Sequence, residues 1–203
     1  MTPAAPRSLS NPRAITERRQ LLTAPHMAPL TEFVETLRGE GRGAVPDFDP
    51  LDGGIEATIL FLMEKPGPMT DDTAIAGRVG SGFISRDNDD PTAAATFSFM
   101  QQAGIDRRQS ILWNTVPWWN GTRKIAGEEM TAGLNRLGSL LDLLPGLKAV
   151  VAVGGRASKA SSFVKSRGLH LILSAHPSPI NRAARPAVWE GIPAQWAEAK
   201  RYL

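Results

Sequence analysis

The sequence predicts an α/β protein in which helices cover both faces of a central, mostly parallel, four-stranded sheet. Four short apolar runs carry this prediction, at residues 58–63, 110–116, 147–153 and 169–174. Continuous apolar runs of this length are typical of strands that are buried on both faces. Helical patterns separate each run from the next, and this alternation favours parallel pairing with right-handed crossovers. We therefore expect a three-layer α/β/α fold.

Five helices are predicted around this sheet, at residues 30–38, 91–102, 128–144, 156–166 and 193–202. Apolar residues recur at helical intervals in the first and third of them. Pro91 stands at the first position of the second helix, and Gly104 follows its end. Pro145 and Gly168 stop the third and fourth helices.

The 203 residues fit a single domain with a substantial core. Residues 1–28 are rich in proline, alanine and arginine, and we expect them to form a loosely ordered N-terminal extension. Residues 29–203 then form the folded domain.

The composition excludes several classes of site. The chain has no cysteine, which excludes disulfides, thiolate zinc sites and iron–sulfur clusters. It has no apolar run of membrane-spanning length, and its first residues lack the apolar core of a signal peptide. We expect a cytoplasmic monomer that uses no cofactor and no metal.

Charge is unevenly distributed along the chain, although the net charge is only +3. Residues 156–201 hold eight basic and two acidic side chains, a net charge of +6. Residues 47–106 hold three basic and eleven acidic ones, a net charge of −8. Such segregation indicates either a polyanion-binding face or an ordinary solvated charge pattern.

Polar residues follow each predicted strand, where parallel sheets bind their ligands. They are Glu64-Lys65, Asn114, Gly154-Gly155 and His176. The glycine pair lacks the full Gly-x-Gly-x-x-Gly pattern of a dinucleotide loop, so it indicates a tight turn. The other three predict a composite site at one edge of the sheet.

His176 stands in the segment His176-Pro177-Ser178-Pro179-Ile180. Each proline fixes its own φ and restrains the preceding residue, so this loop is stiff. A stiff loop suits a histidine that must act at one point in space. The alternative is a proline-rich surface turn with an exposed histidine.

This segment and Trp113-Asn114-Thr115-Val116 together resemble two motifs of the uracil-DNA glycosylase superfamily. The resemblance covers residues 57–203 and implies a glycosylase-like domain. It implies that Asn114 reads a flipped base and that His176 is catalytic. It also implies a DNA-binding loop in which Ser178 and Pro179 precede Ile180, an apolar wedge. Arg182 and Arg185 would contact phosphates.

The chain departs from the superfamily after its first strand. Met63-Glu64-Lys65-Pro66-Gly67 aligns Lys65 with the catalytic acid of the best-known branch, and a charged lysine is unable to act as a base. We favour Asp87 as the replacement, because residues 82–87 resemble a Phe-Thr-Gly-Asp turn of another branch. Glu64 is the rival by position.

Two further acids and an apolar wall complete the expected pocket. Asp89 or Asp90 could also serve as the acid, although Asp90 is placed to cap the helix that starts at Pro91. Phe83 or Ile84 would stack on the base, beside Glu64 and Lys65.

The resemblance predicts a monofunctional enzyme of base excision repair. It would flip uracil, and other damaged bases, out of single- or double-stranded DNA and hydrolyse the N-glycosidic bond. The first alternative is a non-catalytic protein of the same fold that binds uracil or lesions. The second is an α/β hydrolase of small molecules that uses His176.

Overall fold

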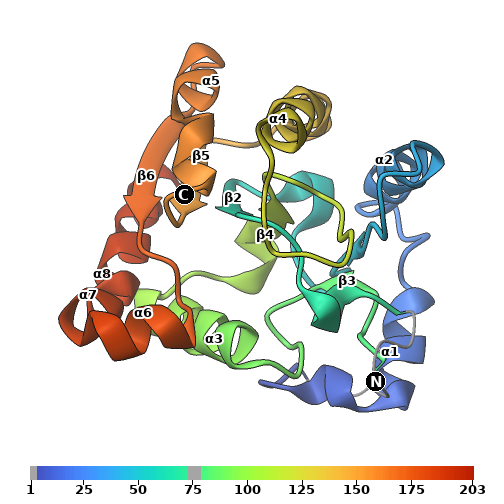
Figure 1. The fold of residues 1–203 in the computed structure, drawn as a ribbon, viewed down its shortest axis with the longest axis horizontal. Helices are drawn as coiled ribbons and strands as arrows, with labels where there is room; N and C mark the ends of the chain where they lie inside the picture. The colour runs from blue at the N-terminus through green and yellow to red at the C-terminus, as the bar shows by residue number, and fades with distance from the viewer. Residues whose placement is uncertain (1–3, 73–78) are drawn as a thin grey trace.

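The computed structural model describes residues 4–72 and 79–203, and its centre is a fully parallel four-stranded sheet (Figure 1). The strand order is β4-β2-β5-β6. The strands are β2 (Ile59–Met63), β4 (Ser110–Asn114), β5 (Ala149–Val153) and β6 (His170–Ser174). Each lies inside one of the predicted apolar runs, so the prediction of a four-stranded parallel sheet is confirmed.

Helices form a layer on each face of this sheet, which confirms the three-layer fold. The chain crosses the sheet in one direction from β2 to β4, and in the other direction when it goes on to β5 and then to β6. Because such connections are right-handed, the helix between β2 and β4 lies on the opposite face from the helices of the two later crossovers. Figure 1 shows α3 on one side of the sheet and α4 and α5 on the other. The helices are α2 (Ala28–Gly39), α3 (Pro91–Ala103), α4 (Gly127–Asp142), α5 (Ser161–Ser166) and α8 (Ile192–Ala197).

Aromatic contacts place the remaining two helices. Trp196 of α8 packs edge-on against Phe61 of β2 with ring centroids 5.0 Å apart. Phe33 of α2 lies 6.1 Å from Trp113 of β4, whose neighbour in register is Leu62. Successive strand residues point to opposite faces, so α8 shares the α3 face and α2 shares the α4 face.

The N-terminal segment packs on the domain, which differs from the loose extension that its composition predicted. Residues 12–19 form α1 (Pro12–Arg19), and Leu9 and Ala14 form a small apolar cluster with Phe83. Arg18 is 4% exposed and binds the carboxylates of Asp49 and Asp87. Composition did not reveal this docking, because the partners of Arg18 are distant in sequence.

Several short elements were not predicted. The strands β1 (Asp47–Phe48) and β3 (Phe83–Ile84) pair in parallel and are too short to show a periodic pattern. The segment after β6 forms α6 (Pro179–Ala184) and α7 (Pro186–Glu190), each with proline at its first position. No helix in the described ranges is both long and apolar enough to cross a membrane.

Candidate active site

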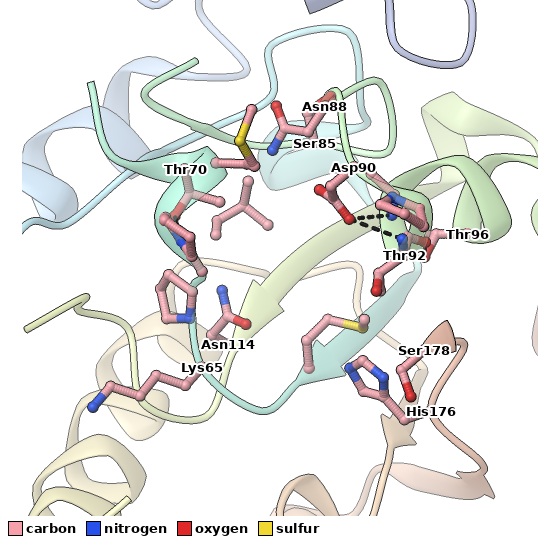
Figure 2. A pocket seen from close by; sticks show the side chains of 18 of the residues that line it. Lys65, Thr70, Ser85, Asn88, Asp90, Thr92, Thr96, Asn114, His176 and Ser178 are labelled. Carbon is pink, nitrogen blue, oxygen red and sulfur yellow. Dashed lines mark hydrogen bonds between the residues drawn. The ribbon is translucent and has the colours of Figure 1, made fainter. Parts of the chain in front are cut away.

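A pocket of about 490 Å³ opens at the carboxyl ends of β2, β4 and β6, on the face that α3 covers (Figure 2). Met63, Leu112 and Ile84 give it an apolar wall. Polar side chains come from the first turn of α3, the end of β4 and the loop after β6. The pocket therefore lies at the sheet edge that the polar residues predicted.

Asn114 ends β4 and carries its side-chain amide into this pocket. The residue is 4% exposed, and its Nδ2 finds no hydrogen-bond partner in the part of the chain that the structure describes. A buried donor without a partner costs about 1–3 kcal/mol. This cost is removed when a ligand in the pocket accepts a hydrogen bond from Nδ2.

His176 follows β6 and lines the same pocket. Its carbonyl accepts a hydrogen bond of 3.1 Å from Nδ2 of Asn181, and the Ser178 hydroxyl caps α6 by accepting one from the Asn181 N–H. Gly154 backs this loop: a Cβ there would lie 3.2 Å from the Cβ of His176 and 2.6 Å from Oε1 of Glu64. The close approach and the positive φ of 94° both require glycine at this turn.

The electrostatic surroundings keep the imidazole of His176 neutral. Burial lowers its pKa, and Arg123 lowers it further, whereas Glu64 and Asp90 raise it; the net shift is below the ordinary value of 6.5. A neutral imidazole donates from one ring nitrogen, so His176 can give a hydrogen bond to an acceptor in the pocket at neutral pH.

Lys65 contributes to the pocket lining, but its side chain points away from the cavity toward α4 (Figure 2). Its Nζ lies 2.9 Å from Oε1 of Glu129, 2.7 Å from Oδ1 of Asn120 and 3.2 Å from the carbonyl of Lys124. The side chain is 3% exposed. Lys65 therefore ties the loop after β2 to the start of α4.

Glu64, also expected in the base pocket, lies beside the pocket and does not line it. Its Oε1 accepts a hydrogen bond of 3.1 Å from the backbone N–H of Arg156. It sits against Gly154 and His176, so its charge acts on the histidine from behind.

The expected catalytic acid, Asp87, is also outside the pocket. Its side chain has no exposed surface and binds two arginines, Arg18 and Arg107, the second at 2.9 and 3.1 Å. Asp49 and Asp52 take part in the same buried cluster. These contacts hold Asp87 where no substrate in the pocket can reach it, which speaks against the expected role.

Phe83 does not stack in the pocket either, and its neighbour Ile84 takes that position. Phe83 is fully buried against Leu9 and Ala14. Successive residues of β3 point to opposite sides, so Ile84 faces the pocket. Of the two alternatives for the stacking face, the structure therefore brings Ile84 to the site.

The expected DNA-binding loop lies at the pocket mouth. Ser178, Pro179 and Ile180 line the pocket, and Ile180 is 81% exposed. Arg182 and Arg185 are exposed just beyond them. The Arg182 guanidinium lies 5.0 Å from the centre of the Trp189 ring, and Nε of Arg185 donates to Oδ1 of Asn181 at 3.0 Å.

Arg123 is a pocket residue that sequence reasoning missed. It lies in the loop between β4 and α4, and it makes no hydrogen bond or ion pair with any residue in the described ranges. Its guanidinium lies beside Gly67, where a Cβ would be 3.7 Å from the nearest guanidinium nitrogen, an ordinary contact distance. Its place after a strand end is the one sequence signal that could have found it.

The structure thus combines a parallel α/β fold with one pocket that holds the asparagine and the histidine of the two motifs resembling those of DNA glycosylases. Comparison with protein-family models matches residues 51–198 to the uracil DNA glycosylase superfamily, and the chain belongs to this superfamily. The resemblance drawn from the two motifs is thereby confirmed. No curated protein matches the chain. Membership supports a DNA glycosylase-like hydrolase function in DNA repair.

Proposed function

We propose that this protein excises uracil from DNA as a monofunctional glycosylase. The observation that carries the proposal is the buried Nδ2 of Asn114, which faces the pocket without a partner in the described ranges, together with His176 in the same pocket. The superfamily match supplies the class of reaction, and these two residues supply the choice of base.

Asn114 fits the Watson–Crick edge of uracil. Uracil presents an acceptor at O4 and a donor at N3, and an asparagine amide offers one donor group and one acceptor. Cytosine presents the opposite order, so a fixed amide discriminates between the two bases. The apolar wall that includes Ile84 gives the ring a surface on which to stack.

His176 supports departure of the base. As the N-glycosidic bond breaks, negative charge builds on the uracil ring, and a neutral imidazole can donate to O2. A fixed donor of this kind is worth about 2.7–4 kcal/mol of transition-state stabilisation. The stiff loop and the hydrogen bond from Asn181 fix the backbone that carries it.

The surface around the pocket suits the flipped state of DNA. Ile180 can occupy the space that the base leaves in the duplex. Arg182 and Arg185 lie beside it and can contact phosphates of single or double strands.

The test is incubation with uracil-containing single- and double-stranded oligonucleotides in the presence of a chelator, followed by alkaline cleavage of abasic sites. We expect abasic product, and a rate reduced by about two to three orders of magnitude in His176→Ala. His170→Ala is the matched control, because His170 is exposed at the opposite end of β6. Binding of uracil-DNA without product at stoichiometric protein would favour the non-catalytic alternative.

A further inference from the structure

Asp90 is the one acid among the described residues that line the pocket. It caps α3: its Oδ1 accepts hydrogen bonds from the N–H groups of Thr92 at 2.8 Å and Ala93 at 2.9 Å. Its second oxygen, Oδ2, accepts no hydrogen bond from any residue in the described ranges. Figure 2 shows this carboxylate at the pocket, held on its helix side by the two bonds.

The cap fixes the carboxylate and leaves half of it available. Two backbone donors and the start of a helix stabilise the ionised form, and they use the same oxygen. The free oxygen is therefore presented to the cavity from a helix end, a rigid support for a group that must hold a water molecule.

The other acids of this region are unable to do the same. Asp87 is buried between arginines, and Glu64 is bound to the Arg156 N–H behind His176. Asp89 pairs with Arg7 at 3.2 Å and does not line the pocket. Geometry thus separates Asp90 from three rivals that sequence position alone left open.

Asp90, Asn114 and His176 surround the cavity from three different elements (Figure 2). With a base held by Asn114 and His176, the carboxylate of Asp90 is the acid on the described pocket lining that can meet the attacking water and the cationic sugar. We propose that Asp90 is the catalytic carboxylate of this enzyme, replacing the acid that the chain lacks at Lys65. This inference rests on the proposed uracil excision.

The reaction balances with these groups and water. The C1′–N1 bond breaks, and its electron pair leaves with the base, whose O2 accepts the hydrogen bond from His176. The oxygen of water bonds to C1′, and the proton that water loses passes to Asp90 and then to solvent. The departing base takes a proton from solvent, so the reaction consumes water and yields free uracil and abasic DNA.

The surroundings of Asp90 also suit a base. Burial raises its pKa above the ordinary value of 3.8, while the N–H groups of Ala93 and Thr92 and the charges of Arg123 and Arg7 oppose the increase. A carboxylate with a raised pKa accepts a proton more readily than an exposed one.

The experiment measures single-turnover excision with enzyme in excess over a uracil oligonucleotide, alongside binding of the same DNA. Asparagine caps helices as well as aspartate does, so Asp90→Asn preserves the cap while removing the charge. We expect its rate to fall by about 10²- to 10⁴-fold, the range for general acid–base groups. Its DNA affinity should be unchanged or higher, because a negative charge is lost.

The matched control is Asp106→Asn, since Asp106 is an exposed cap whose side chain accepts from the Arg108 N–H at 2.7 Å, away from the pocket. It should retain the wild-type rate. An Asp90→Asn rate within about threefold of wild type would overturn the role of Asp90 and leave uracil excision intact. Absence of product from the wild-type protein would instead overturn the proposed function. Asp90→Ser, another capping residue, should show the same loss as Asp90→Asn.

Discussion

Replacing Lys65 by methionine should lower the stability of the protein and leave its chemistry intact. The ammonium group lies 2.9 Å from Oε1 of Glu129 and also donates to Asn120 and the Lys124 carbonyl. Methionine keeps much of the apolar stem and removes the charge and all three hydrogen bonds. The perturbation therefore isolates the contacts that tie the loop after β2 to α4.

The expected loss of stability follows from what Glu129 retains. Removing one partner of a buried ion pair costs about 3–5 kcal/mol. Glu129 is 14% exposed and keeps three other donors, from Trp118, Asn120 and the Ala126 N–H. We therefore expect the lower end of the range, about 3 kcal/mol, which for a chain of this length lowers the melting temperature by about 6–12 °C.

The stability lost in Lys65→Met should also depend on pH, and the pKa of Glu129 gives the direction of that dependence. Burial acts to raise the pKa of Glu129, but the Ala126 N–H and the Lys65 ammonium outweigh it, and the pKa lies below its ordinary value of 4.5. A carboxyl group whose pKa is lowered by folding stabilises the protein fully above its unfolded pKa. The difference between wild type and Lys65→Met should thus be complete above about pH 5 and shrink as pH falls further.

Urea unfolding followed by tryptophan fluorescence measures the free energy difference. Lys159→Met is the control, because Lys159 is exposed and its ammonium group makes no hydrogen bond or ion pair in the described ranges. This substitution should change stability by less than about 0.5 kcal/mol. A Lys65→Met variant as stable as this control would refute the assigned role of Lys65. Lys65→Asp provides a second test. The side chain of residue 65 points away from the pocket, so an aspartate there should not reach the substrate. A large gain in excision rate would contradict this geometry.

Three further predictions concern the pocket and the DNA surface. Asn114→Asp should reduce the ratio of uracil to cytosine excision, because a carboxylate places an acceptor against O4; an unchanged ratio would remove Asn114 from base recognition. Neutralising Arg182 and Arg185 together should weaken DNA binding for every sequence and lower the salt slope by up to about 2, and an unaltered slope would place both off the DNA path. Burial lowers the pKa of His176, so the excision rate should stay level as pH falls to 6.5 and decline below it. A decline that begins above pH 7 would show that the imidazole is not kept neutral.

The strands and the position of the site could be predicted from the sequence because both depend on local patterns. Residues 59–63 and 149–153 are continuous apolar runs, and runs of this length are typical of strands that are buried on both faces of a sheet. In a parallel sheet the carboxyl ends of all strands lie at one edge, so Asn114 and His176 were expected at the same edge. They follow the two outermost strands, β4 and β6, and the loop after β6 carries His176 back to the pocket that Asn114 lines. The prolines on either side of Ser178 likewise predicted a stiff loop.

Tertiary structure alone decided which acid lines the pocket. Local patterns mark Asp87 by its turn and Asp90 as a helix cap, and neither pattern shows which of the two carboxylates reaches the pocket. Arg18, 69 residues before Asp87, and Arg107, 20 residues after it, close around one carboxylate and withdraw it from the pocket. The start of α3 turns the other toward the cavity. Ion pairs between distant residues depend on how the whole chain packs, and a sequence pattern records only neighbours.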